Sequence, residues 1–304
     1  MKKIVISLID YKGQQKTDAC LLSLDQMRFT NMEVEVVVID NFPSSPFKSE
    51  KKYKNFQLKV IRPEKNLGFA GGHNLGIEYA KAKEADFVVV LNNYTTVDEN
   101  LLIELVRPCE KDSKIGAVVP KIYFMKGHEY HKDRYKQPDL GKVIWYAGGH
   151  MDWDNINGVH EGVDEVDNGQ FDQDRKVDLL TGCCVLFTKS ALESIVGFNE
   201  SYFLYYEDAD LNERLKKACF KVHFAAKAHL WHLKAGSTGG SGSVLQDYFI
   251  SRNRLLFGMR FASSRTKIAL IRESLRILVS GREWQKIGVK DFYKRKFGKG
   301  SFGL

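Results

Sequence analysis

Residues 34–41 read VEVVVIDN, a run of β-branched residues that ends in two polar side chains. Further short apolar runs and amphipathic, helix-like stretches alternate along the first third of the chain, at residues 3–9, 17–27, 58–61, 74–82 and 87–91. Val- and Ile-rich strands separated by helices are typical of a parallel sheet built from βαβ units. The sequence therefore predicts an α/β fold with a central, mostly parallel sheet.

Polar residues follow the predicted strands directly. They are Asp10 after the first strand, Asp40 and Asn41 after the second, Asn66 after the third, and Asn92 and Asn93 after the fourth. In open α/β sheets, ligands bind outside the carboxyl ends of the strands. We therefore expect the functional site at this edge of the sheet.

The composition of the 304-residue chain, 43% hydrophobic and 28% charged, is that of a globular protein with a sizeable core. Its five cysteines include no C-x-x-C pair, which argues against both a disulfide framework and a structural zinc site. A net charge of +8 favours an anionic partner: nucleic acid, a membrane surface or a phosphorylated small molecule. The sequence has no uncharged apolar run of the roughly 18 residues that a membrane span needs, and its first apolar run is too short for a secretory signal, so we expect a cytoplasmic protein.

The rest of the chain divides into segments of different character. They are an irregular or hairpin-rich insertion (127–176), a return of regular patterns (177–196), a helix (207–218), a flexible Gly/Ser-rich loop (236–243), two basic helical segments (245–261 and 265–279) and a basic tail. We divide the sequence into a domain over residues 1–262 and a basic helical C-terminal extension over residues 263–304.

The stretch Gly68-Phe69-Ala70-Gly71-Gly72 precedes a predicted helix. Glycines there allow backbone N–H groups to approach phosphates at the positive end of a helix, although a glycine-rich stretch taken alone is more often a simple turn. A dinucleotide-binding fingerprint would place G-x-G-x-x-G directly after the first strand, where the chain has Asp10-Tyr11-Lys12-Gly13. Dinucleotide binding is therefore disfavoured.

Two further features can carry chemistry. Glu207, Asp208 and Asp210 open a predicted helix, where carboxylates serve either as helix caps or as a general base for a hydroxyl group. His232 lies at or just beyond the end of an apolar, strand-like run, so it is either structural or a ligand of the site.

The ordered set of motifs resembles family 2 glycosyltransferases of the GT-A fold, especially rhamnosyltransferase-like members. The motifs are Asp40-Asn41, Asn66 to Gly72 with Asn74, Leu91-Asn92-Asn93, Thr181-Gly182, Gly197-Phe198-Asn199-Glu200, Phe203 to Leu211, and Trp231-His232. The resemblance covers residues 1 to about 260 in the family's order. Each motif is weak alone, and the ordered set is specific.

This resemblance implies a GT-A, nucleotide-diphospho-sugar transferase fold and assigns roles to individual residues. Asp10 and Asp40 would line the nucleotide pocket, with Asp40 accepting from the N3–H of uracil or thymine. The other donor-side residues would be Asn66, Gly68, Gly72, Asn92 and Arg252. Asp208 would be the catalytic base, Thr181, Gly182 and Glu207 would lie on the acceptor side, and His232 would help to hold a metal or the diphosphate.

One position departs from the family's pattern. The family usually has an Asp that binds Mg²⁺ or Mn²⁺ where this chain has Tyr94, and a neutral phenol is a poor ligand for either ion. Three interpretations stay open: an inactivating change, a metal site rebuilt around Asn92, Asp98 and His232, or basic residues in place of the metal.

The resemblance implies an inverting glycosyltransferase that moves a sugar, rhamnose by analogy, from a UDP- or dTDP-sugar to an acceptor hydroxyl in polysaccharide or glycolipid assembly. The alternative is a catalytically impaired nucleotide-sugar-binding protein, which Tyr94 would explain. Nucleic-acid binding is disfavoured because the sequence shows no RRM or OB signature.

The C-terminal extension is expected to bind an anionic membrane surface at the inner face of the cell membrane, where a glycan or lipid-linked acceptor would be presented. Ile268, Ile271, Leu275 and Leu278 recur at helical spacing, with Arg265, Arg272 and Arg276 on other faces. Basic and aromatic tail residues favour the membrane: Trp284, Lys290, Phe292, Tyr293, Lys294, Arg295, Lys296, Phe297 and Lys299. The alternative is that the apolar stripe packs on the rest of the protein.

Overall fold

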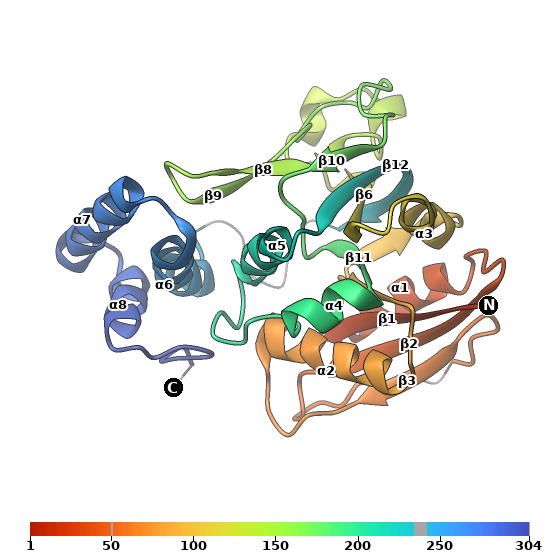
Figure 1. The fold of residues 1–304 in the computed structure, drawn as a ribbon, viewed down its shortest axis with the longest axis horizontal. Coiled ribbons are helices and arrows are strands. Elements are labelled where there is room, and N and C mark those ends of the chain that lie inside the picture. Colours follow the sequence, from red (N-terminus) through yellow and green to blue (C-terminus); the bar gives the residue numbers. More distant parts are fainter. Residues whose placement is uncertain (50, 234–241, 304) are drawn as a thin grey trace.

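The computed structural model describes residues 1–49, 51–233 and 242–303, and is built on a central sheet flanked by helices (Figure 1). The strands are β1 (Lys2–Asp10), β2 (Met32–Asp40), β3 (Gln57–Ile61), β4 (Phe87–Leu91), β5 (Thr95–Val97), β6 (Ile115–Phe124), β7 (Ile144–Tyr146), β8 (Gly149–Asp152), β9 (Asn157–His160), β10 (Arg175–Val177), β11 (Cys184–Thr188) and β12 (Lys221–His232). The α-helices are α1 (Gln14–Leu24), α2 (Gly68–Ala82), α3 (Leu101–Lys111), α4 (Lys189–Ile195), α5 (Glu207–Lys217), α6 (Val244–Phe261), α7 (Ser264–Ser280) and α8 (Glu283–Tyr293).

The main sheet has ten strands within the described residues, and its central path runs β10-β12-β6-β11-β4-β1-β2-β3. Strands β1 to β4 pair in parallel, as do β6 and β12, whereas β11 lies antiparallel between β4 and β6. All five residues of β4, FVVVL, are buried, which is typical of a central strand covered on both faces. The predicted α/β fold with a mostly parallel sheet is confirmed.

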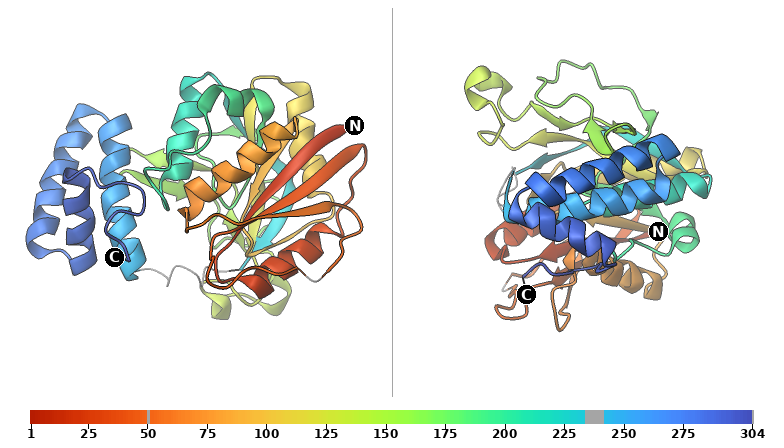
Figure 2. Two further views of the ribbon diagram at one scale, coloured as in Figure 1. Left: turned by 90° about the horizontal axis from the view of Figure 1, so that it is seen from below. Right: turned by 90° about the vertical axis from the view of Figure 1, so that its left-hand side faces the viewer.

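The helices α1 and α2 lie on opposite faces of the parallel half of this sheet (Figure 2). The crossover from β1 to β2 runs in the opposite direction along the sheet from the crossover between β3 and β4, and right-handed crossovers then place their helices on opposite faces. In the register of β1 and β2, Asp10 is opposite Asp40, so the polar strand ends meet at one edge, as expected.

Helix α2 begins at Gly68, six residues before the predicted start at residue 74, so the glycine-rich stretch forms the first turns of the helix. The expected irregular insertion contains a β8–β9 hairpin, together with β7 and β10, which pair with β6 and β12. The predicted helices at residues 207–218, 245–261 and 265–279 correspond to α5, α6 and α7. Residues 236–241 of the predicted flexible loop lie outside the described residues.

The C-terminal helices α6, α7 and α8 pack together beside the sheet-containing part (Figures 1 and 2). A second hydrophobic cluster joins them to the β8–β9 region and to α5 through Met151, Ile156, Tyr202, Ala209, Leu255, Phe257, Leu270 and Val289. Helix α8 lies within the segment that the sequence suggested was a basic tail. The division at residues 262 and 263 falls between α6 and α7, and stays a prediction.

Candidate active site

A cleft of about 800 Å³ lies at the carboxyl ends of the central strands, a size typical of small-molecule sites. Most of the polar residues and glycines singled out by sequence line it: Asn41, Asn66, Gly68, Asn92, Asn93, Tyr94, Thr181, Gly182, Glu207, Asp208 and His232. Asp10, Asp40, Gly72, Asp98 and Arg252 are not among the described residues that line it. The structure therefore brings most of the predicted site into one cavity and places the others behind or away from its wall.

The carboxylate of Asp40 is fully buried and shapes a loop beside the cleft. Its oxygens accept hydrogen bonds from the backbone of Phe42 and Phe47, and one of them pairs with Arg62 Nε at 2.8 Å. Asp10 is also buried; burial raises the pKa of its carboxyl, and the hydrogen bond from Thr17 opposes this. Both aspartates are therefore engaged in hydrogen bonds within the protein and do not line the cleft in this conformation.

The cleft-lining polar residue at the end of β2 is Asn41. Its amide nitrogen donates to the carbonyl of Gly68 at 2.8 Å, and its amide oxygen accepts from the backbone of Leu67. Asn41 thereby ties β2 to the start of α2. Gly68 has φ of +70°, and a Cβ added there would lie 2.6 Å from the Phe203 ring. The first turn of α2 therefore requires glycine on two independent grounds.

The carboxylate of Asp208 lines the cleft in a fixed orientation. One oxygen accepts from the backbone N–H of Gly182 at 3.1 Å, and the other accepts from the N–H of Ala209 at 2.8 Å. Burial raises the pKa of Asp208 above its ordinary value, and these backbone hydrogen bonds limit the increase. The result is a positioned carboxylate with increased basicity, next to the Thr181-Gly182 turn.

The neighbouring Glu207 has a different environment. It is 5% exposed, and its Oε2 has no hydrogen-bond partner among the described residues. Burial, with the nearby charge of Asp208, raises the pKa of the Glu207 carboxyl well above its ordinary value. Glu207 therefore retains its proton to higher pH than an exposed glutamate does, whereas the Asp208 carboxylate has backbone donors that stabilise its charged form. Asp210, the third carboxylate, is fully buried in ion pairs with Arg214 and Arg260 and has a structural role.

The loop that presents these carboxylates has an unusual backbone. Phe203, Tyr205 and Tyr206 all have positive φ values, between 65° and 71°, which is costly for residues other than glycine. Two side chains of α6 hold the loop: Arg252 donates to the carbonyl of Tyr202 at 3.0 Å, and Asn253 Nδ2 lies within 2.9 Å of the carbonyls of Tyr202, Leu204 and Tyr205. Arg252 is fully buried in this position and acts on the loop from outside the cleft.

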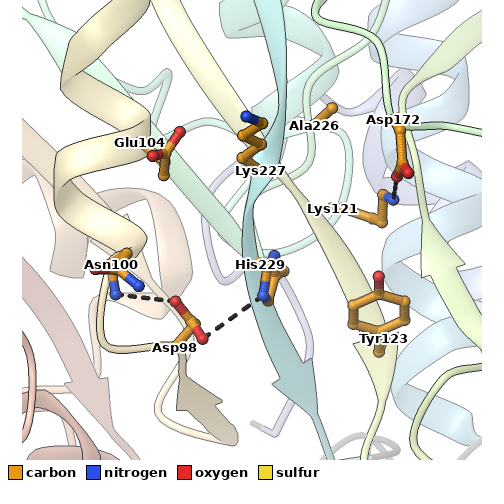
Figure 3. Close-up of a pocket in the computed structure, with 9 residues that line it drawn as sticks. All are labelled: Asp98, Asn100, Glu104, Lys121, Tyr123, Asp172, Ala226, Lys227 and His229. Atoms are coloured by element: carbon orange, nitrogen blue, oxygen red, sulfur yellow. Dashed lines mark hydrogen bonds and ion pairs between the residues drawn. The ribbon is translucent and has the colours of Figure 1, made fainter. Parts of the chain in front are cut away.

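Of the three residues proposed for a rebuilt metal site, Asn92 and His232 line the main cleft and Asp98 does not. Asp98 accepts from the backbone of Asn100 and lies 3.6 Å from His229, in a separate polar pocket beside Lys121, Tyr123 and Lys227 (Figure 3). His232 lines the main cleft instead, where burial lowers its pKa to about 4 and its Nδ1 has no partner among the described residues.

The donor set around position 94 does not fit a divalent cation. Tyr94 lines the cleft with the Nζ of Lys16 4.3 Å from its ring centre, and the Asn92 side-chain oxygen accepts from the Tyr94 backbone. Within the described residues there is no group of three or more His, Cys, Asp or Glu side chains arranged to hold a metal. Mg²⁺ sites use one or two carboxylates together with the substrate's phosphates, and position 94 supplies none.

Several lining residues were missed from the sequence. The ring of Trp145, from the irregular insertion, lies 4.9 Å from that of His232. Lys299 and Phe302 reach the cleft because the chain after α8 folds back, with Gly298 N–H donating to the carbonyl of Ser201. These contacts are long-range, and nothing in the local sequence marks them. Asn253, beside the predicted Arg252, is a polar residue of α6 that no local sequence pattern distinguishes.

The family profile described as "Glycosyltransferase like family 2" matches residues 19–258, which is most of the chain. The chain belongs to glycosyltransferase family 2. This glycosyltransferase is 44% identical over 221 residues to the N-acetylglucosaminyl-diphospho-decaprenol L-rhamnosyltransferase of Mycobacterium tuberculosis, covering 69% of this chain and 70% of that protein. It is 24% identical over 249 residues to the low-salt glycan biosynthesis hexosyltransferase Agl10 of Haloferax volcanii, covering 81% and 74%.

Solved structures confirm the GT-A fold of this glycosyltransferase. GalNAc-T7 with UDP, GalNAc and Mn²⁺ matches with a TM-score of 0.64 at 15% identity, covering 96% of this chain and 54% of that one. The mannosyltransferase PcManGT of Pyrobaculum calidifontis, with GDP-Man and Mn²⁺, matches with a TM-score of 0.53 at 11% identity, covering 99% and 76%. None of the helices in the described part of this glycosyltransferase has the length and apolar character to cross a bilayer.

Proposed function

We propose that this family 2 glycosyltransferase moves a sugar, rhamnose in the first instance, from a UDP- or dTDP-sugar to an acceptor hydroxyl with inversion at the anomeric carbon. The observation that carries the proposal is the Asp208 carboxylate, held at the cleft by the backbone N–H groups of Gly182 and Ala209. A carboxylate in a fixed orientation at the cleft wall is suited to act as a general base.

In the proposed reaction, Asp208 accepts the proton of the acceptor hydroxyl while the acceptor oxygen attacks the anomeric carbon from the face opposite the diphosphate. The bond between that carbon and the diphosphate oxygen breaks, and the nucleoside diphosphate leaves with the bonding electrons. Inversion follows from this single displacement. The neutral form of Glu207 is able to donate a hydrogen bond to the acceptor sugar from the same wall.

The leaving diphosphate needs positive potential, and the cleft supplies it from two sources. The start of α2 faces the cleft at Gly68 and Phe69, and a helix N-terminus favours phosphate groups. Lys65 and Lys299 also line the cleft. Because the donor set around Tyr94 does not fit Mg²⁺ or Mn²⁺, we assign no step to a metal ion.

We propose a lipid-linked glycan as the acceptor and a peripheral position at the inner face of the cell membrane. Support comes from the Mycobacterium relative, whose name specifies a diphospho-decaprenol acceptor, and from the apolar side chains Leu245, Phe249 and Phe302 along one wall of the cleft. Apolar walls suit the start of a lipid chain better than they suit a free oligosaccharide.

The proposal is tested by offering UDP- and dTDP-sugars with an N-acetylglucosaminyl-diphospho-prenol acceptor, with and without Mn²⁺, and measuring released UDP or dTDP. Acceptor-dependent release and a product of inverted configuration are expected. Tyr94 supports a second candidate, a nucleotide-sugar-binding protein without transferase activity. Donor binding by calorimetry with no acceptor-dependent release would favour that candidate.

A further inference from the structure

Helix α7 carries a row of exposed apolar side chains. Ile268, Ile271, Leu275 and Val279 are 52%, 39%, 54% and 80% exposed, respectively. They recur every three or four residues, so they lie along one face of the helix. The opposite face is already used: Thr266, Leu270 and Ser274 are buried, and Leu270 joins the cluster shared with α6 and α8. Leu278, expected in the stripe, packs partly against this cluster, and Val279 takes its place.

A row of arginines runs parallel to the apolar row. Arg265, Arg272 and Arg276 are exposed, and at 3.6 residues per turn they fall on one flank of the apolar stripe. The single acidic residue of α7, Glu273, is paired with Arg254 of α6 at 2.6 Å. The exposed face therefore has an apolar centre and a positive edge without a competing free carboxylate.

The segment after α7 is less suited to insert into a bilayer than its composition suggests. The Trp284 ring lies 5.2 Å from that of Phe302 and 6.1 Å from that of Tyr248, and Phe292 packs against the second hydrophobic cluster. The backbone of Ser301 donates to Asp291 at 2.8 Å, which fixes the turn after α8. Trp284 and Phe292 are therefore committed to packing. Tyr293 is 48% exposed, and its hydroxyl hydrogen-bonds with that of Ser274 on α7.

We propose that α7 lies flat on an anionic lipid surface, with Ile268, Ile271, Leu275 and Val279 inserted at the headgroup boundary and the arginine row on lipid phosphates. Amphipathic helices with a basic polar face bind in this orientation. Helix α7 is the outermost helix of the C-terminal group (Figure 1), so the rest of the protein does not cover this face. A second copy of the chain is a poorer occupant, because four side chains on one helix are far fewer than the 20–30 residues per side of a stable interface.

This inference deepens the proposed function, because an enzyme acting on a lipid-linked acceptor must approach the bilayer, and it can be tested without any transferase activity. The full-length protein is mixed with phosphatidylcholine vesicles, with or without phosphatidylglycerol, at low and high salt, and the sedimented fraction is measured. We expect binding to the anionic vesicles at low salt and weaker binding at high salt.

The stripe variant Ile268→Ser/Leu275→Ser should lower the partition coefficient at least tenfold, because it removes two large apolar side chains from the contact. The variant Arg272→Gln/Arg276→Gln should lower it about 30-fold on anionic vesicles and little on neutral ones. Leu22→Ser is the matched control, since Leu22 is 42% exposed on α1, far along the chain from α7. All five substituted residues are exposed in the structure, and unfolding curves check that the variants fold.

Failure of the parent protein to sediment with anionic vesicles at low salt would overturn the inference, as would a stripe variant that sediments like the parent. A concentration-dependent dimer that becomes monomeric in the stripe variant would also overturn it and assign the face to a second copy. Nucleotide release with a short-chain, water-soluble acceptor tests the transfer reaction separately and should be unchanged in all variants. Vesicle binding without any nucleotide release would contradict the proposed function and leave the docking surface supported.

Discussion

The side-chain nitrogen of Asn253 lies 2.8 Å from the carbonyl oxygen of Tyr205. This contact joins the C-terminal helix α6 to the last strained residues before Glu207 and Asp208. The same nitrogen also lies within hydrogen-bond distance of the carbonyls of Tyr202 and Leu204, so one buried amide contacts three carbonyls of the same loop. The position of the proposed base therefore depends on a helix outside the sheet.

Replacing Asn253 should loosen this loop. In Asn253→Ala, the partly buried carbonyls of Leu204 and Tyr205 lose this donor, whereas the Tyr202 carbonyl keeps Arg252, and we expect the free energy of unfolding to fall by about 2–3 kcal/mol. Turnover should fall with little change in donor affinity, because the base is displaced while the donor side stays intact. Urea unfolding and steady-state kinetics measure both. Asn168→Ala, in an exposed loop, is the control and should change neither; equal effects of the two substitutions would refute the assigned role of Asn253.

Alanine substitutions at Gly68 and Gly127 distinguish the cost of backbone strain from the cost of steric overlap. Both have positive φ, +70° and +82°, but an added Cβ at Gly127 meets nothing within 4 Å, whereas at Gly68 it overlaps Phe203. We expect Gly127→Ala to cost about 1 kcal/mol from strain, and Gly68→Ala to cost about 2–4 kcal/mol from strain and overlap together. Thermal unfolding gives the comparison. Similar losses in both variants would mean that Phe203 moves aside freely.

The buried Glu207 should make stability depend on pH. Its folded-state pKa is raised above 4.5, so the folded protein binds this proton more tightly than the unfolded chain does. Stability is then lost as pH rises above about 4.5, over the range up to the folded pKa. Glu207→Gln mimics the neutral form, so its stability relative to the parent should increase with pH. A difference that stays constant between pH 4 and pH 8 would show that Glu207 has an ordinary pKa.

Position 94 should control the response to metal. Tyr94→Asp restores a carboxylate at the strand end, and we expect Mn²⁺ to increase the affinity for a UDP- or dTDP-sugar about tenfold or more in this variant, and little in the parent. Tyr94→Asn is the control, because it removes the ring without adding charge. Calorimetry of donor binding with and without Mn²⁺ is the measurement. An equal effect of Mn²⁺ on donor affinity in all three proteins would show that position 94 does not control metal binding.

The sequence predicted those features that depend on local pattern. Alternating apolar runs located the parallel strands, and the polar residues after them located the cleft edge, as the register of Asp10 opposite Asp40 confirms. The start of α2 was misplaced because five residues around Gly68 lack the apolar periodicity of the later turns, and the helix begins where glycine is needed by contact with Phe203.

Long-range contacts account for what the sequence could not predict. Arg252 was expected on the donor side, but its guanidinium is buried against the loop before α5, a partner about 50 residues away. Trp284 was expected at a membrane because the segment after α7 is basic and aromatic, and its packing against Tyr248 becomes visible only in three dimensions. A basic and aromatic composition therefore predicts a membrane-binding surface only when those side chains are known to be exposed.

The central claim, that Asp208 is the general base of an inverting glycosyl transfer, is tested most directly by acceptor-dependent turnover of the Asp208→Asn variant. The substitution keeps the size of the side chain and removes its basicity, so turnover should fall about 10²- to 10⁴-fold, with donor affinity little changed. Asp210→Asn, which weakens the buried ion pairs with Arg214 and Arg260, should instead lower stability and leave most of the turnover of the folded enzyme. Near-parental turnover in Asp208→Asn would contradict the account.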